Sequence, residues 1–315
     1  MDDIMVSVIC LTYNHEKYIR QCLESLVNQQ TSFKYEVFVH DDASTDGTTE
    51  IIREYEKKYP TIIRPIYQSE NQYSKGVTIT NTYIIPKARG KYLAWCEGDD
   101  SWISENKLQE QVGFLETHLD YSCCLHNVCF QNLYNGDTYN VPGIKKARDY
   151  GTGEIIRRGC FFQISSLVMR KDLYLEKPAV FIAKGFGDWP LFIYGSICGK
   201  LHVFSDTMSL HRHGVPGSWT ERIKSNVEMA KTHNNSMIEM LSAVDSFYAG
   251  FYSKEIGYAI RRAEYNLAKN SEDKTIMHSR KYLPFYLAEI KKNFYSALKA
   301  CFPWLVRIKR RLFVG

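Results

Sequence analysis

The chain has 315 residues, of which 44% are hydrophobic and 24% charged, an ordinary globular balance. No apolar stretch approaches the roughly 20 residues that a membrane-spanning helix needs. Seven Lys or Arg and no Asp or Glu follow Ile290, and subtracting these seven charges from the net +5 leaves residues 1–290 at −2. A near-neutral body argues against a nucleic-acid-binding protein, which would carry its own basic stripe.

The start of the chain and its cysteines indicate the cellular compartment of the protein. The acidic start Met1-Asp2-Asp3 differs from a secretory signal. The nine cysteines lie mostly in apolar segments and are typical of reduced core thiols. We therefore expect a cytoplasmic protein.

The first 120 residues alternate strand and helix patterns. The apolar runs 6–11, 35–39, 62–67 and 92–96 predict strands. Helical spacing of apolar residues predicts a helix over 16–29, capped by Asn14, and another after Ser104. Between them, a helix that carries Ile51, Ile52 and Tyr55 is expected to start from a cap at Ser44, Thr45 or Asp46 and to stop near Pro60. A shorter helix is expected before residues 88–90. This alternation predicts an α/β fold with a mostly parallel sheet flanked by helices, a Rossmann-like nucleotide-binding half.

The later elements are less regular. Residues 121–130 and 164–169 predict strands, and 201–204 and 207–210 predict two short ones. Residues 131–160 are rich in glycine and polar residues and predict a loop or hairpin. Asp188 precedes Trp189-Pro190, a pattern typical of a helix start. Helices are expected over 219–247, 253–270 and 274–300, which places a domain boundary between 1–218 and 219–315.

Polar clusters follow three of the predicted strands. They are Thr12-Tyr13-Asn14, Asp41-Asp42 and the acidic turn Glu97-Gly98-Asp99-Asp100. In parallel sheets ligands bind outside the carboxyl ends of the strands. Mg²⁺ often binds through one or two carboxylates together with substrate phosphates. The three clusters together predict a divalent-cation and nucleotide site, although the acidic turn alone is equally typical of a solvated loop.

Two nucleotide-binding motifs are missing from the sequence. A dinucleotide-binding fold requires glycines in its first strand-to-helix turn, and the turn after residues 6–11 has none. There is also no glycine-rich loop ending in Gly-Lys-Ser/Thr. Two classes of protein stay open at this point: a nucleotidyltransferase, which also uses strand-end carboxylates and Mg²⁺, and a non-catalytic nucleotide-binding or membrane assembly protein.

The combined motifs resemble the inverting glycosyltransferases of family 2, which have the GT-A fold. The resemblance covers about residues 5–220. It rests on residues 6–14, on Asp41 to Thr48, on Ala88-Arg89-Gly90 followed by the acidic turn, on Gly187 to Phe192, and on His211 to Gly214. Glu97 stands where the family usually has Asp, and His211 stands where it usually has Arg, with Arg212 shifted by one.

The resemblance implies a role for each of several residues. Asp188 would be the catalytic base. Donor contacts would come from Leu11, Tyr13, Asp42, Glu97 and Asp99. The ligands of Mg²⁺ or Mn²⁺ would be Asp100, Asp99 and His213. A helix N-terminus lowers a carboxylate pKa, which would weaken Asp188 as a base, whereas burial under Trp189 and Phe186 would raise it.

The resemblance also implies the partners. They are a nucleotide-sugar donor, with uridine favoured by Asp42, and an acceptor hydroxyl on a growing glycan or lipid-linked saccharide. The basic tail, which includes Trp304 and Phe313, is typical of a segment that lies on an anionic membrane surface. A peripheral position on the inner face of the cell membrane is therefore expected. The alternative is a helix packed on the body.

Overall fold

A mixed central sheet organises the molecule, for which a computed structural model describes residues 4–140, 144–181 and 188–301. The main strands follow the spatial order β3-β2-β1-β4-β9-β6-β10-β5. Their bounds are β1 Ile4–Thr12, β2 Lys34–Asp41, β3 Ile63–Tyr67, β4 Tyr92–Trp95, β5 Ser101–Trp102, β6 Tyr121–Asn132, β9 Val168–Arg170 and β10 Lys200–His213. Two further strands, β7 (Thr138–Asn140) and β8 (Arg148–Asp149), pair with β6 and β10.

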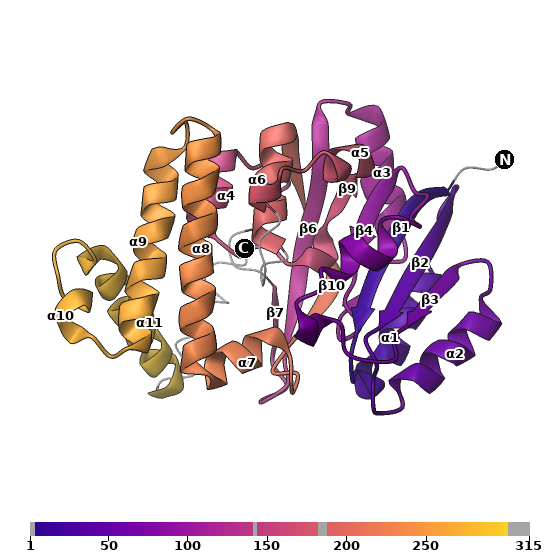
Figure 1. Ribbon diagram of the computed structural model, residues 1–315, viewed down its shortest axis with the longest axis horizontal. Coiled ribbons are helices and arrows are strands. Elements are labelled where there is room, and N and C mark those ends of the chain that lie inside the picture. Colours follow the sequence, from indigo (N-terminus) through magenta and orange to yellow (C-terminus); the bar gives the residue numbers. More distant parts are fainter. Residues whose placement is uncertain (1–3, 141–143, 182–187, 302–315) are drawn as a thin grey trace.

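Parallel pairing dominates the N-terminal half of the sheet. β3, β2, β1 and β4 are parallel neighbours, as the alternation of strands and helices predicts. β9 is antiparallel to both β4 and β6, while β6 and β10 are parallel. Because β1, β2 and β4 are parallel, the polar residues that follow them meet at one edge of the sheet (Figure 1).

Helices cover both faces of the sheet. The helices of the α/β part are α1 Glu16–Val27, α2 Thr48–Lys58, α3 Lys107–Thr117, α4 Thr152–Arg158, α5 Lys171–Leu175 and α6 Asp188–Cys198. Short helical turns lie at Tyr73–Lys75, Thr80–Ile84, Ile164–Ser166 and Ala179–Phe181. One buried cluster joins α1, α2 and α3 to the sheet, and a second joins α4, α6, α8 and α9 to its other face.

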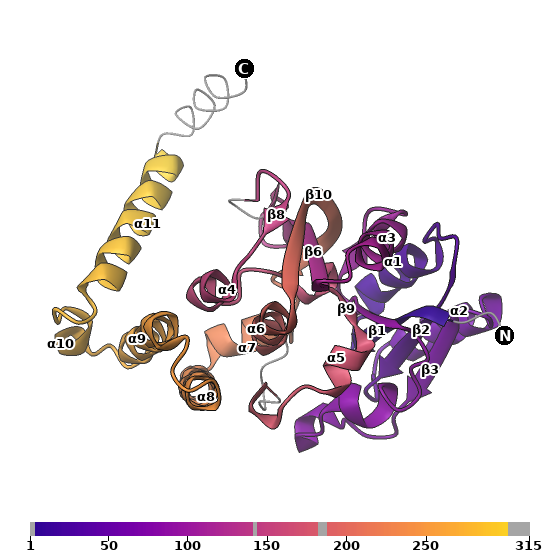
Figure 2. The same ribbon diagram turned by 90° about the horizontal axis from the view of Figure 1, so that it is seen from above.

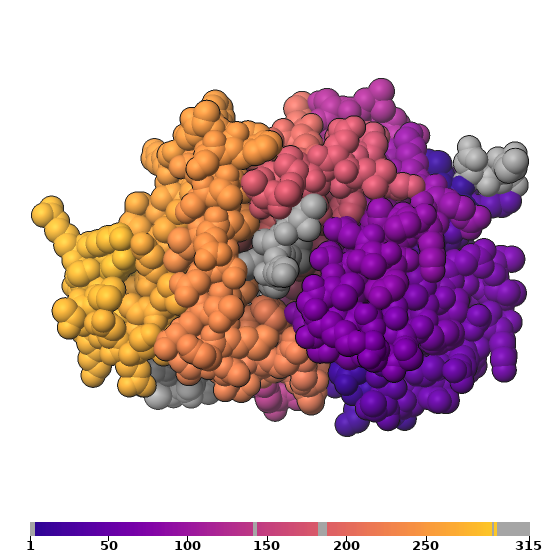
Figure 3. All heavy atoms as spheres, in the orientation of Figure 1, coloured from indigo at the N-terminus to yellow at the C-terminus, as the bar shows by residue number. Residues whose placement is uncertain are grey.

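The C-terminal helices form a separate layer beside the sheet. They are α7 Trp219–Ser225, α8 Val227–Phe247, α9 Ser253–Asn270, α10 Lys274–Met277 and α11 Leu283–Cys301. In Figures 1 and 3, α8 and α9 stand to the left of the α/β part. α9 is tied to α4 because the Arg262 guanidinium donates to the Arg157 carbonyl oxygen at 2.7 Å.

The expected α/β fold with a helical C-terminal extension is confirmed, with corrections inside it. Residues 164–169 are not one strand, because a helical turn at Ile164–Ser166 precedes β9. The two short strands expected over 201–210 are one strand, β10, which accommodates register shifts between Phe204 and Ser209. An irregularity inside a strand interrupts the apolar pattern of its sequence, so one strand is predicted as two.

After residue 219 the helices are shorter and more numerous than the apolar spacing predicts. The segment expected over 219–247 divides at Asn226, whose side chain accepts from the Met229 amide and caps α8. The segment expected over 274–300 divides into α10 and α11, the second with Pro284 in its first turn. Asn14 is not the cap of α1: its φ is +57°, and its side chain accepts from the Thr45 amide instead.

Candidate functional site

The acidic turn leaves β4 and immediately joins β5, so it sits at the carboxyl edge of the sheet. The Gly98 amide donates to the Leu11 carbonyl oxygen at 2.9 Å, which holds the turn against the end of β1. β5 then pairs antiparallel with β10, with Ser101 opposite Leu210. One step further along this register, Asp100 lies opposite His211.

Gly98 is the residue that allows this close approach. A Cβ at position 98 would lie 2.6 Å from Thr12 Oγ1 and 2.9 Å from His15 Nδ1. Real Cβ atoms do not come this close, so any side chain would push the turn away from the end of β1.

We expect Gly98→Ala to destabilise the protein by about 1–3 kcal/mol, since overpacking forces the backbone to shift. Gly113→Ala, in α3, is the matched control, because nothing lies within 4 Å of its added Cβ. Replacing this helical glycine should be neutral or stabilising by about 0.5–1 kcal/mol. Urea unfolding measures both. Equal midpoints for Gly98→Ala and wild type would contradict the close packing.

Asp100, which is buried, and His211, which is partly buried, form an ion pair. His211 Nδ1 lies 3.0 Å from the Asp100 carboxylate, and the Arg212 amide donates to Asp100 Oδ1 at 3.2 Å. Burial alone would lower the pKa of His211, but the charges of Asp100 and Asp99 and the hydrogen bond to Asp100 raise it to about 9. His211 is therefore a cation at neutral pH, and its charge faces the acidic turn.

The Arg212 side chain links the acidic turn to α1. Its guanidinium donates to the Asp99 carbonyl oxygen at 2.5 Å and to the Gln21 side chain, and it lies over the Tyr18 ring. Successive residues of a strand point to opposite faces. This alternation explains why Arg212 contacts α1 while His211 faces Asp100. Arg212 thus positions the turn.

Glu97 and Asp99 experience strong mutual repulsion. Burial and then the charge of Asp100 raise the pKa of Asp99. The Glu97 side chain is exposed to solvent. Reduced solvation by the protein atoms near it, followed by the charges of Asp99 and Asp188, nevertheless raises the pKa of Glu97 well above its usual range. A cation bound here would relieve the repulsion.

Asp188 begins α6 and belongs to the same site. Burial raises its pKa to about 6; the charge of His211 lowers it and that of Asp100 raises it further. Burial, one of the two effects expected at this position, is therefore the largest influence on the pKa of Asp188. Trp189 points into the core and donates to the Ile155 carbonyl oxygen at 3.1 Å. Phe186 lies outside the described residues.

Asp42 lies across the site at the end of β2. Its two carboxylate oxygens accept from the backbone amides of Gln72 (2.8 Å) and Tyr73 (3.0 Å). These bonds fix the loop that carries Tyr73, which is 44% exposed. Ala43, which follows Asp42, has a φ of +64°, so the chain turns sharply at this point.

Tyr13 and Leu11 come from the end of β1. Tyr13 is 43% exposed, and Leu11 is partly buried against the core. The next residue, Asn14, accepts from the Thr45 amide at 2.7 Å, and its own amide donates to Ser44 Oγ at 2.9 Å. These bonds lock the loop after β1 onto the loop after β2.

His213 lies apart from the acidic turn. Its Nε2 is 2.6 Å from Lys224 Nζ and 4.0 Å from a Glu221 oxygen, so these polar neighbours come from α7. Burial and then the charge of Lys224 lower its pKa. The structure thus brings His211, and not His213, against Asp100. The metal role given to His213 stays a prediction.

Arg222 is a further residue of the site that motif matching misses. Its guanidinium lies 5.5 Å from the Tyr73 ring centre and 5.6 Å from that of Trp219. The charge of Glu97 acts on Tyr73, so Arg222 lies on the same side of the site as the acidic turn. Its place in α7, beyond the last motif, gave no signal in the sequence.

The side chains of the site supply some, but not all, of the ligands that a hard cation needs. Within the described residues, no three His, Cys, Asp or Glu side chains are grouped so that they alone hold a metal ion. Crowded carboxylates with raised pKa values nevertheless fit Mg²⁺ or Mn²⁺, which accept one or two carboxylates and complete their shell with substrate phosphates and water.

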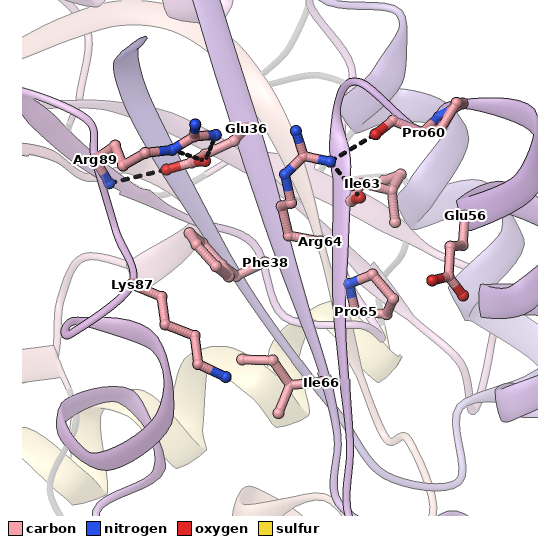
Figure 4. Close-up of a pocket in the computed structure, with 10 residues that line it drawn as sticks. All are labelled: Glu36, Phe38, Glu56, Pro60, Ile63, Arg64, Pro65, Ile66, Lys87 and Arg89. Atoms are coloured by element: carbon pink, nitrogen blue, oxygen red, sulfur yellow. Dashed lines mark hydrogen bonds and ion pairs between the residues drawn. The ribbon is translucent and has the colours of Figure 1, made fainter.

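A separate hollow lies at the β2–β3 side of the sheet (Figure 4). Arg89 there donates to the buried Glu36 carboxylate at 3.0 Å through Nε. None of the predicted site residues lines this hollow, which is bordered by Glu36, Phe38, Glu56, Pro60, Ile63, Arg64, Pro65, Ile66, Lys87 and Arg89. The Ala88-Arg89-Gly90 motif therefore supports the sheet.

Comparison with known proteins agrees with this fold. Residues 7–172, more than half of the chain, match the model of Glycosyl transferase family 2. The chain belongs to this family.

Two relatives illustrate the range of the family. The uncharacterized protein Rv1520 of Mycobacterium tuberculosis is 32% identical over 251 residues, covering 79% of this chain and 70% of its own. WfaP of Escherichia coli, a UDP-Glc:alpha-D-GlcNAc-diphosphoundecaprenol beta-1,3-glucosyltransferase, is 32% identical over 140 residues, covering 44% of this chain and 50% of its own.

Solved structures of low identity share the GT-A fold. Staphylococcus aureus TarS, in complex with UDP-GlcNAc, has a TM-score of 0.55 and 17% identity, covering 85% of this chain and 79% of its own. The mannosyltransferase PcManGT of Pyrobaculum calidifontis, in complex with GDP-Man and Mn²⁺, has a TM-score of 0.52 and 14% identity, covering 95% and 87%.

Proposed function

We propose that this protein is a metal-dependent, inverting glycosyltransferase that moves a sugar from a UDP-sugar to an acceptor hydroxyl. The observation that carries the proposal is the meeting of Asp188, the acidic turn and His211 at the carboxyl edge of the sheet, in a member of glycosyl transferase family 2. This arrangement supplies both a base and a place for developing negative charge.

The base is Asp188. An acceptor hydroxyl needs a general base within hydrogen-bond reach, and a carboxylate with a pKa of about 6 is both ionised at neutral pH and more basic than an ordinary Asp. Asp188 takes the hydroxyl proton as the oxygen attacks the anomeric carbon from the side opposite the leaving nucleotide, which inverts that carbon.

The leaving diphosphate is held at the acidic turn. Asp100 and Asp99 are the proposed ligands of Mg²⁺ or Mn²⁺, with the predicted His213 available from β10. Such an ion, when bound, neutralises the charge that develops on the leaving diphosphate. The cationic His211 fixes Asp100 in place, and Arg222 adds positive charge on the Tyr73 side.

The nucleotide end of the donor is assigned to the loops after β1 and β2. Tyr13 offers an exposed ring for the base to pack on, and Leu11 borders it. Each Asp42 oxygen already accepts one backbone amide but keeps a second lone pair, which suits the N–H of uracil. Glu97, one methylene longer than the usual Asp, is assigned to the ribose hydroxyls.

The proposed acceptor is a growing glycan or a lipid-linked saccharide. WfaP, a relative of 32% identity, is named for a diphosphoundecaprenol acceptor. We place the protein in the cytoplasm, on the inner face of the cell membrane, with residues 1–218 as the catalytic domain. The basic segment 301–315, expected to contact that membrane, lies outside the described residues.

A panel of nucleotide sugars tests this function. The purified protein is incubated with UDP-, dTDP- and GDP-sugars, with Mn²⁺ or with EDTA, and nucleoside diphosphate release is measured. We expect release from a UDP-sugar only with Mn²⁺, and product of inverted configuration by NMR. Binding without release would favour a non-catalytic binder. Pyrophosphate release from a nucleoside triphosphate and a sugar phosphate would favour a nucleotidyltransferase.

A further inference from the structure

Helix α11 has one face that packs on the rest of the protein. The Phe285 ring centre lies 5.2 Å from that of Tyr258 and 5.9 Å from that of Tyr265, both in α9. The Tyr265 hydroxyl donates to Glu289 at 2.7 Å, and Tyr282, just before α11, is buried. These contacts fix the rotation of the helix about its axis.

The opposite face of α11 is an apolar stripe open to solvent. Leu283, Leu287 and Ile290 follow a spacing of four and three residues, which aligns them on one side of a helix. Their exposed fractions are 41%, 53% and 46%. These three residues, called the α11 stripe, extend over about 10 Å of the helix.

Such a stripe needs an explanation. A contiguous row of exposed large apolar side chains is unfavourable in water and marks an interaction surface. In Figure 2, α11 leaves α9 and α10 and runs away from the body, with no other labelled element beside its second half. The described part of the chain thus leaves this face of α11 to a partner.

The charges around the stripe decide which partner fits. Every charged residue after Ile290 is basic: Lys291, Lys292, Lys299, Arg307, Lys309, Arg310 and Arg311. Lys291, directly after the stripe, is exposed. Two copies of this segment would repel each other, whereas a negatively charged surface attracts it.

We infer that the α11 stripe docks on an anionic lipid surface, with the helix lying in the plane of the interface. An amphipathic helix binds there by burying its apolar face while its basic residues meet the anionic headgroups. We do not place α11 across the bilayer, because no helix in the described ranges is both long enough and apolar enough to cross one.

Docking α11 also orients the catalytic part. α11 packs on α9 through Phe285, and α9 is bonded to α4 through Arg262. A helix held at the membrane therefore holds the α/β part beside it. This surface differs from segment 301–315, and its assignment stands apart from the proposed glycosyl transfer.

Paired charge substitutions in the full-length protein test the inference. Leu287→Glu with Ile290→Glu places two negative charges in the stripe. Ala288→Glu with Asn293→Glu is the matched control, since both positions are exposed and lie outside the stripe while the net charge changes equally. Co-sedimentation is measured with phosphatidylcholine vesicles that contain or lack phosphatidylglycerol.

We expect wild type to bind the phosphatidylglycerol vesicles, the stripe variant to bind at least about tenfold more weakly, and the control to lose much less. Equal loss in the two variants would mean that charge alone drives binding, and equal retention would mean that the stripe is not the contact; either overturns the inference. If wild type fails to bind vesicles and instead sediments as a dimer that only the stripe variant dissociates, the stripe contacts a second copy of the chain.

Circular dichroism and UDP-sugar turnover are measured on the same samples. They distinguish misfolding and loss of the proposed activity from loss of docking.

Discussion

Asp188→Asn is expected to reduce sugar transfer by about 10²–10⁴-fold while leaving Mn²⁺-dependent donor binding within a factor of a few of wild type. The amide keeps the size and shape of the carboxylate but cannot accept the acceptor proton. Its loss of charge removes one repulsive neighbour of Glu97, so the donor site should bind at least as well.

Steady-state kinetics and isothermal titration calorimetry on the same preparation separate the two effects. Asp172→Asn is a suitable control, because Asp172 is an exposed carboxylate in the first turn of another helix, α5. Transfer by Asp188→Asn at the wild-type rate would show that another group is the base.

The pH dependence gives a second test of the same residue. The base works only when ionised, and burial raises the pKa of Asp188 to about 6. Activity in kcat/KM should therefore be level above about pH 7 and fall about tenfold per unit below pH 6. An ordinary exposed Asp would keep its activity down to about pH 4. A profile that stays level to pH 4.5 would contradict a base with a raised pKa.

The sequence predicted the parts of the site that depend on local pattern. Strand ends in a parallel sheet share one edge, so the strand pattern alone was enough to place Asp42 and the acidic turn together. The family resemblance added Asp188, which begins α6 as the Trp-Pro pattern predicts.

What could not be predicted depends on pairing between distant residues. Asp100 meets His211 because β5 pairs antiparallel with β10 in one register, and a shift of two residues would have brought His213 to Asp100 instead. Asn14 likewise bonds to Thr45, 31 positions away, and not to the helix that follows it. Sequence spacing carries no information on either register.

Asp100→Asn is expected to abolish Mn²⁺-dependent donor binding. The substitution removes one of the two carboxylates proposed to hold the cation, and it leaves the partly buried, protonated His211 facing an amide. Removing one partner of a fully buried ion pair costs about 3–5 kcal/mol, and because water reaches His211 the cost here should be smaller, but the variant should still unfold at lower urea concentration. Unfolding is therefore measured beside binding, at a temperature where both proteins are folded.

His211→Gln and His213→Gln then assign the two histidines. His211 contacts Asp100, whereas His213 contacts Lys224 and Glu221. If the geometry of β10 governs the metal site, His211→Gln should weaken Mn²⁺-dependent UDP binding about tenfold or more, because Asp100 loses its positioning partner. His213→Gln should have the smaller effect. The reverse order would show that His213 moves to the cation when the donor binds. Donor binding to the wild-type protein that is unchanged by EDTA would remove the metal from the proposal.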